Sequence, residues 1–298
     1  MCNLKLSGLG VAMVTPMNID GSVNFETLDK LVDYQIEGGA DFLLAMGTTG
    51  ESATLEESER IAIIKAIIKK VDKRVPLIVG VGDNYTKRLL EKIERFTLDG
   101  VDGFLSIVPY YNKPNQEGIY RHFCELNKAS KLPIILYNIP GRTGVNAKPE
   151  TIKRIADDCE KIFAVKEAAG SVDQVKQLVD LLGQRLTILS GDDHLTIPFM
   201  KVGAKGVISV VGNAYPRYFS QLVAYALNKD WEKAQSMDQR LEQLYQLLFV
   251  EGNPGGIKSL LKSMELIPND TMRLPLTEVS HKTAEQLFEV YQTLGTDH

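Results

Sequence analysis

Short apolar runs alternate with longer amphipathic stretches eight times along the chain. The runs are rich in β-branched or bulky residues and are bounded by Gly, Pro, Asn or Asp, which is typical of β-strands. Their near-continuous apolar character indicates strands buried on both faces, as in a parallel sheet. The predicted strands are residues 10–14, 42–46, 77–81, 103–108, 134–137, 162–166, 187–189 and 206–210.

The stretches between these runs carry apolar residues at helical spacing. Leu28, Leu31, Val32 and Ile36 fall on one face of a predicted helix, and the same spacing recurs in three other stretches.

Local start signals support these helices. Thr54 with Glu57 and Ser171 with Gln174 each match a capping box, in which side chains satisfy free amides of the first turn. Pro149 suits a first helical position, where its missing N–H has no partner to lose.

Eight βα units over residues 8–228 predict a TIM (β/α)8 barrel. A doubly wound open sheet is the alternative, but it usually has fewer strands, and no GxGxxG motif follows any predicted strand. We therefore expect a barrel over residues 1–228. Residues 229–298 show helical spacing and no strand, which predicts a C-terminal helical extension packed on the barrel.

The charge and composition exclude several classes of function. The formal net charge is -4, so nothing favours binding to nucleic acid or to an acidic membrane. No apolar run approaches the length of a membrane span, and no basic and then apolar leader opens the chain. The three cysteines show neither a disulfide framework nor CxxC spacing, so we expect a cytoplasmic protein in a reducing compartment.

The strand at 162–166 ends in a lysine, which is unusual for a buried strand. Because side chains alternate along a strand, Ile162, Ala164 and Lys166 are predicted to share the face that points into the barrel. Burial there lowers the pKa of an ammonium and yields a nucleophilic neutral amine. An interior ion pair with Asp192 or Asp193 is the alternative, and catalysis is favoured because lysines are seldom buried for packing alone.

The residues that follow other strands are expected at the same mouth of the barrel, where active sites of this fold lie. Segment 47–51, Gly-Thr-Thr-Gly-Glu, offers backbone amides and two hydroxyls to an anion such as a carboxylate, although it also fits a plain polar turn. Tyr137 ends its strand at the mouth, and Arg142 lies in a flexible, Gly-flanked loop suited to clamp a carboxylate. Tyr110 and Tyr111 follow another strand, where a phenol can pack, relay protons or reach across an interface.

Other chemistries are less well supported. The four histidines are dispersed without HxH or HExxH spacing, so no metal site is expected, and the GxSxG motif of a hydrolase is absent. The loop at the usual phosphate site of this fold begins Gly191-Asp192-Asp193, whose charges repel phosphate. A carboxylated substrate is therefore favoured over a phosphorylated one.

Taken in order, these segments resemble the dihydrodipicolinate synthase family, within the N-acetylneuraminate lyase superfamily. Segments 47–51, 109–111 and 137–144 and the Lys166 strand carry the resemblance, and 191–193 and 206–209 extend it over nearly the whole chain. It implies the condensation of pyruvate with L-aspartate 4-semialdehyde, the first committed step toward diaminopimelate and lysine, with no external cofactor.

The resemblance also implies roles for individual residues. Lys166 would form an imine with pyruvate, whose carboxylate would sit on Thr48 and Thr49. Thr48, Tyr137 and Tyr111 would relay protons, and Tyr111 would come from a second subunit across a tight dimer interface. The implied assembly is a homotetramer built as a dimer of dimers.

Three further positions match substrate-binding residues of the family, namely Arg142, Gly191 and Ile208. Arg142 would orient the carboxylate of the second substrate. Pyruvate-dependent sugar-acid lyases of the same superfamily typically lack this arginine, so it favours the synthase over such a lyase. A non-catalytic barrel that binds keto acids is a third possibility, disfavoured because the whole set of site residues is retained.

Two features depart from better-known members of the family. Arg88 stands where lysine-inhibited enzymes carry a glutamate, and Glu57 and Arg60 replace histidines, so we expect weak or absent inhibition by lysine. In Asn253-Pro254-Gly255-Gly256 two glycines follow the proline, where better-known members carry bulkier residues. These glycines either begin the next helix or loosen the barrel mouth.

Overall fold

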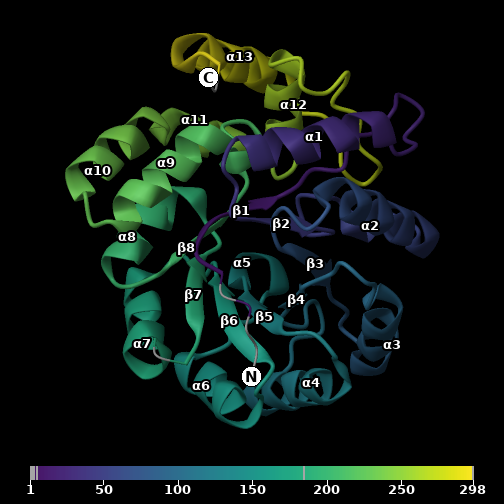
Figure 1. Ribbon diagram of the computed structural model, residues 1–298, viewed down its shortest axis with the longest axis vertical. Helices are drawn as coiled ribbons and strands as arrows, with labels where there is room; N and C mark the ends of the chain where they lie inside the picture. The colour runs from purple at the N-terminus through teal and green to yellow at the C-terminus, as the bar shows by residue number, and fades with distance from the viewer. Residues whose placement is uncertain (1–3, 5, 184, 297–298) are drawn as a thin grey trace.

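The computed structural model describes residues 4, 6–183 and 185–296 of the chain. Its eight parallel strands pair in chain order from β1 to β8, and β8 pairs again with β1 to close a barrel. Helices surround this barrel (Figure 1). The predicted TIM barrel is confirmed, and the alternative of an open sheet is wrong.

All eight predicted strands are found where the apolar runs indicated. The largest difference is at β1, which begins and ends two residues earlier than predicted. The strands are β1 Gly8–Ala12, β2 Phe42–Ala45, β3 Leu77–Val81, β4 Gly103–Ile107, β5 Ile134–Asn138, β6 Ile162–Glu167, β7 Thr187–Ser190 and β8 Gly206–Ser209.

The helices follow the strands and continue beyond the last of them. The helices that follow the barrel strands are α1 Phe25–Glu37, α2 Glu57–Val71, α3 Thr86–Phe96, α4 Gln116–Ala129, α5 Pro140–Thr143, α6 Pro149–Asp158, α7 Val172–Leu182, α8 Thr196–Lys201 and α9 Pro216–Leu227. Three 3-10 turns lie between them, η1 Ser52–Thr54, η2 Asp193–Leu195 and η3 Val211–Asn213. The later ones are α10 Trp231–Arg240, α11 Glu242–Phe249, α12 Gly255–Ser263 and α13 His281–Leu294.

The predicted helix starts are partly confirmed. Pro149 is the first residue of α6, and the side chain of Ser171 accepts a hydrogen bond from the Gln174 amide at the start of α7. The capping box predicted at Thr54 is wrong. Glu56 caps α2 instead, in a reciprocal pair with Glu59, because Thr54 belongs to the preceding 3-10 turn.

The strand side chains divide between a core inside the barrel and a larger one between the strands and the helices. Ala164 and Tyr137 belong to the inner core, and Val165 belongs to the outer one. The predicted placement of Ile162 on the inner face is wrong. The pairing of β5 with β6 shifts by one residue there, so Phe163 joins the inner core and Ile162 the outer one.

The helices after the barrel pack on one another and on the barrel wall. In Figure 1, α10 lies beside α8 and α9, while α12 and α13 lie at the edge of the molecule next to α11. The division into a barrel to residue 228 and an extension beyond it stays a prediction. None of the described helices is long and apolar enough to cross a membrane.

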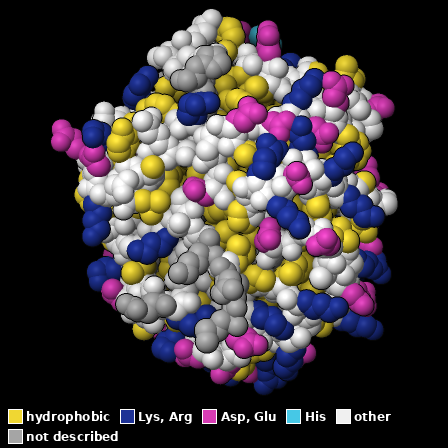
Figure 2. All heavy atoms as spheres, in the orientation of Figure 1, with side chains coloured by type: hydrophobic (Ala, Val, Ile, Leu, Met, Phe, Trp, Pro, Cys, Tyr) yellow, Lys and Arg dark blue, Asp and Glu magenta, His cyan; other side chains and the backbone are white. Residues whose placement is uncertain are grey.

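The surface and the thiols add two observations. Basic and acidic side chains are interspersed over the face in Figure 2, in keeping with the small net charge. Cys124 and Cys159 are free thiols whose sulfur atoms lie 3.5 Å apart, a proximity that their sequence spacing does not reveal. Cys2 lies outside the described residues, and the reducing compartment stays a prediction.

Candidate active site

Lys166 lies on β6 inside the barrel, where 5% of its surface is exposed. Its Nζ atom is 4.5 Å from the centroid of the Tyr137 ring. Within the described part of the chain, Lys166 has no hydrogen bond and no ion pair. Burial lowers its pKa to about 8, although the negative charges of Asp192 and Asp193 act in the opposite direction. Lys166 is therefore a desolvated amine with a larger neutral, nucleophilic fraction near neutral pH than an ordinary lysine has.

The ion pair considered as an alternative for Lys166 is not formed. Oδ2 of Asp193 instead accepts hydrogen bonds from the backbone N–H groups of Val210 and Val211, each at 3.0 Å. Asp193 thus fixes the turn after β8, and its charge influences Lys166 without a direct contact.

Gly191 lies next to Lys166, and Ile208 belongs to the inner core of the barrel. A Cβ atom on Gly191 would lie 3.1 Å from Cε of Lys166 and 2.7 Å from Cβ of Ala168, so a glycine leaves room for the lysine side chain. Ile208 is fully buried in the inner core that also contains Tyr137.

Tyr137 lies opposite Lys166 in the pairing of β5 with β6. Burial raises the pKa of its phenol, so the hydroxyl is protonated at neutral pH. A neutral phenol beside an amine and at the barrel mouth is suited to exchange protons with a reacting group.

The predicted anion-binding turn, residues 47–51, begins directly after β2. Its last residue, Glu51, has left-handed backbone geometry with φ 53°, and the carbonyl of Gly50 accepts a hydrogen bond from the Thr15 hydroxyl at 2.7 Å. Thr49 is buried, and its hydroxyl oxygen accepts a hydrogen bond from Nδ2 of Asn253 at 3.0 Å. Thr48 is half-buried beside it.

Arg142 differs from the prediction of a flexible loop, since it lies in the one-turn helix α5. Its side chain is exposed at the cavity described below. The segment after α5 is anchored because the Asn146 side chain bonds those of Asn138 and Gln174, and both of these donate to Glu167. Burial raises the pKa of Glu167 to about 7.

A cavity of about 570 Å³ opens at the carboxyl ends of the strands. Thr48, Tyr137 and Arg142 line it together with Tyr110 and Asn253. Three of the predicted site residues thus meet at one cavity, with Lys166 next to the ring of Tyr137.

Five predicted site residues do not line this cavity. Lys166, Thr49 and Ile208 are buried, Gly191 is half-buried, and Tyr111 is exposed. Tyr111 has left-handed backbone geometry with φ 71°, and 87% of its surface is exposed. Tyr110 lines the cavity instead, and burial raises the pKa of its phenol.

The same cavity extends to the residues considered for lysine inhibition. Arg60 and Arg88 line this part, and Nη1 of Arg88 lies 3.7 Å from Oδ2 of Asp83. Glu57 does not line it and instead forms an ion pair with Arg95 on α3. The cavity therefore presents two guanidinium groups at this end.

Two residues that support the turn at 47–51 were not among the predicted site residues. Asn253 contacts Thr49, and the buried Lys258 forms an ion pair with Glu51 at 2.5 Å. Gly255 and Gly256 are the first residues of α12, in line with one of the two predicted interpretations. A Cβ on Gly256 would lie 2.6 Å from the carbonyl oxygen of Leu248, so this glycine lets α12 start directly against α11.

Comparisons with known proteins agree with this geometry. Curated 4-hydroxy-tetrahydrodipicolinate synthases from Porphyromonas gingivalis and Parabacteroides distasonis are 50% and 46% identical to the chain, over 97% and 99% of it and 98% and 99% of their own lengths. The solved dihydrodipicolinate synthase of Thermotoga maritima superposes with a TM-score of 0.94 at 39% identity, covering 96% of this chain and 98% of that one. Another similar structure, with a TM-score of 0.93 at 39% identity over 96% of both chains, is described as a monomeric dihydrodipicolinate synthase variant. The model of the dihydrodipicolinate synthetase family matches residues 5–294, and the chain belongs to this family.

Proposed function

We propose that this protein is a 4-hydroxy-tetrahydrodipicolinate synthase, which condenses pyruvate with L-aspartate 4-semialdehyde through an imine on Lys166. The observation that carries the proposal is an unpaired lysine with a lowered pKa, buried beside a tyrosine at the mouth of a TIM barrel. The curated relatives named for this activity support it.

The first half of the reaction uses pyruvate alone. The neutral amine of Lys166 attacks the keto carbon, and loss of water leaves an imine. Thr48 and Tyr137 move the protons that this exchange requires, and the pyruvate carboxylate binds the turn that contains Thr48 and Thr49. Removal of a methyl proton then converts the imine to an enamine.

The second half forms the new carbon–carbon bond. The enamine carbon attacks the aldehyde, and the resulting alkoxide takes up a proton. The amino group of the second substrate then attacks the imine carbon, which closes the ring and releases Lys166. Arg142 holds the carboxylate of the semialdehyde through its planar guanidinium group.

We propose that a second copy of the chain completes the relay with its Tyr111. A phenol that is 87% exposed and does not line the cavity of its own chain fits a contact between subunits. Mixing the inactive variants Lys166→Ala and Tyr111→Phe tests this, because subunits that exchange restore one intact site in a mixed dimer. Recovered activity supports the shared site, and no recovery in mixed dimers confirmed by mass contradicts it. The complete assembly is proposed to be a homotetramer.

Borohydride reduction in the presence of pyruvate tests the central step. We expect a stable adduct on the peptide that contains Lys166, detected by mass spectrometry, and none in Lys166→Ala. Lys258 is a matched control, because it is equally buried but paired with Glu51. An adduct on another lysine, or no adduct, contradicts the proposal. Adding L-aspartate 4-semialdehyde or sugar-derived aldehydes to the same enzyme then separates the synthase from a sugar-acid lyase.

A further inference from the structure

The hydrogen bond between Asn253 and Thr49 joins residues 204 positions apart in the chain. Asn253 directly precedes Pro254, the N-cap residue of α12, outside the eight βα units, while Thr49 lies in the turn after β2. Both side chains are at least nine-tenths buried, and Asn253 lines the cavity that contains Tyr137 and Arg142. The contact therefore links Thr49 to a residue in the wall of the proposed active site.

This hydrogen bond leaves the hydrogen of the Thr49 hydroxyl available to a different acceptor. Because Oγ1 of Thr49 accepts from the Asn253 amide, its own O–H is left to donate elsewhere. In the described part of the chain, no acceptor receives that hydrogen. A buried donor of this kind, next to Thr48 and Asn253 in the cavity wall, matches an anionic oxygen of a ligand.

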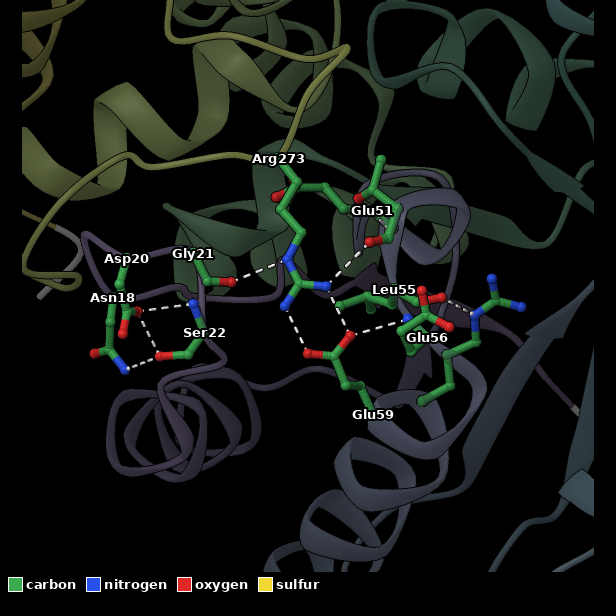
Figure 3. A network of polar contacts seen from close by, with 11 residues as sticks. Asn18, Asp20, Gly21, Ser22, Glu51, Leu55, Glu56, Glu59 and Arg273 are labelled. Carbon is green, nitrogen blue, oxygen red and sulfur yellow. Dashed lines mark hydrogen bonds and ion pairs between the residues drawn. The ribbon is translucent and has the colours of Figure 1, made fainter.

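A second contact, from the helix that follows Asn253, holds the far end of the turn. Nζ of Lys258 on α12 forms a buried ion pair with Glu51 and donates to the carbonyl of Thr271 at 2.8 Å. Figure 3 shows the next fastening: Arg273 forms a two-pronged ion pair with Glu59 and donates to the carbonyl of Gly21. The turn at 47–51 is thus held from residues 253 and 258, both beyond the last strand of the barrel, while Arg273 holds the neighbouring start of α2.

From these contacts we infer that Asn253 is a positioning residue for pyruvate, acting through the hydroxyl of Thr49. The inference rests on the proposed function and deepens it. Asn253 donates to Thr49 and thereby directs the Thr49 hydrogen to the substrate carboxylate. Lys258 holds Glu51, and with it the end of the same turn, in place.

Two replacements of Asn253 test the positioning role through their effects on the KM for pyruvate. Asn253→Ala removes the donor, and we expect a three- to tenfold increase in the KM for pyruvate, about the effect of one hydrogen bond, with kcat nearly unchanged. Asn253→Asp keeps the shape but can only accept, so the Thr49 hydrogen turns away from the substrate. We expect its KM to exceed that of Asn253→Ala by a further factor of about ten, since the carboxylate also repels the anion.

The double variant Thr49→Val/Asn253→Ala separates action through Thr49 from direct contact with pyruvate. We expect it to have the same KM for pyruvate as Thr49→Val alone, because the hydroxyl that Asn253 orients is gone. Asn24→Ala is the control for a lost asparagine hydrogen bond, since the half-buried Asn24 caps α1 and does not line the cavity. It should lower thermal stability and leave the KM for pyruvate as in the wild type.

The pyruvate dependence of borohydride trapping on Lys166 is measured alongside KM in every variant. An unchanged KM in Asn253→Ala, a lower KM in Asn253→Asp than in Asn253→Ala, or an undiminished Asn253→Ala effect in the Thr49→Val background overturns the inference. In those cases the adduct in the wild-type protein still stands. Absence of that adduct in the wild-type protein overturns the proposed function itself and the inference with it.

Discussion

The buried ion pair between Lys258 and Glu51 sets a quantitative expectation for the variant Lys258→Met. Both side chains are 0% exposed, and Oε2 of Glu51 has no hydrogen-bond partner among the described residues. Removing the lysine therefore leaves a buried carboxylate without its cation. We expect a loss of about 3–5 kcal/mol in the free energy of unfolding.

The pKa shifts of Glu51 and Lys258 compare the cost of burying the pair with the attraction between its two charges. Burial raises the pKa of Glu51 and lowers that of Lys258, and in each case it outweighs the attraction between them. The pair is thus costly to bury, and its loss as a whole is less harmful than the loss of one member. The double variant Lys258→Met/Glu51→Gln is expected to regain most of the stability that Lys258→Met loses.

Thermal and urea unfolding measure this difference, at one fixed protein concentration because assembly contributes to stability. A loss of 3–5 kcal/mol corresponds to a fall in Tm of about 6–10 °C for a chain of this size. Lys262→Met is the matched control on the same helix. Lys262 pairs with Asp270 at 2.8 Å but is 51% exposed, so its loss should cost less than about 1 kcal/mol.

A large cost of the unpaired carboxylate is refuted if the free energy of unfolding of Lys258→Met is within about 1 kcal/mol of the wild-type value, the range expected for an exposed pair. It is also refuted if the double variant is no more stable than Lys258→Met. In the first case Glu51 finds another partner or takes up a proton at little cost. In the second case the side chain of Lys258 stabilises the protein by packing and not through its charge.

Three further predictions concern the reaction. Because burial lowers the pKa of Lys166 to about 8, kcat/KM for pyruvate should rise about tenfold from pH 7 to pH 9 as the free amine forms, and a flat profile in initial rates contradicts this. Arg142→Ala should lower kcat/KM for the semialdehyde by about 10- to 100-fold while trapping of pyruvate on Lys166 persists; an equal loss of trapping would show that Arg142 serves the first substrate instead. L-lysine should inhibit the wild type weakly or not at all, and Arg88→Glu should increase inhibition, because a carboxylate then replaces a cation in the cavity wall; a clear submillimolar inhibition curve for the wild type contradicts this.

The barrel and the position of Lys166 were predictable because they depend on short-range pattern. Strands buried on both faces require apolar runs, and a lysine at the carboxyl end of such a run lies at the barrel mouth. The errors arise where a neighbouring strand or turn decides the outcome. The shift at Ile162 comes from its pairing with β5, and the cap at Glu56 comes from the 3-10 turn that takes Thr54.

The support of the turn at 47–51 was beyond pattern analysis for a different reason. Asn253 and Lys258 carry no sign in the sequence that they meet Thr49 and Glu51, since packing of α12 alone brings them there. A buried lysine in an amphipathic helix has no distinctive spacing. The role of Gly256 was equally hidden, because its close approach to Leu248 exists only once α11 and α12 are folded together.

The site therefore draws on three structural levels that respond differently to change. Lys166 and Tyr137 lie within strands, where packing on both sides fixes them and with them the proposed imine chemistry. Arg142 lies in a short helix after β5, so it can vary without disturbing the barrel, which suits the proposed selection of the second substrate. Asn253 lies outside the barrel units and reaches the turn that is proposed to hold pyruvate. A change in the packing of the C-terminal helices should therefore alter the affinity for pyruvate before it alters the chemistry at Lys166.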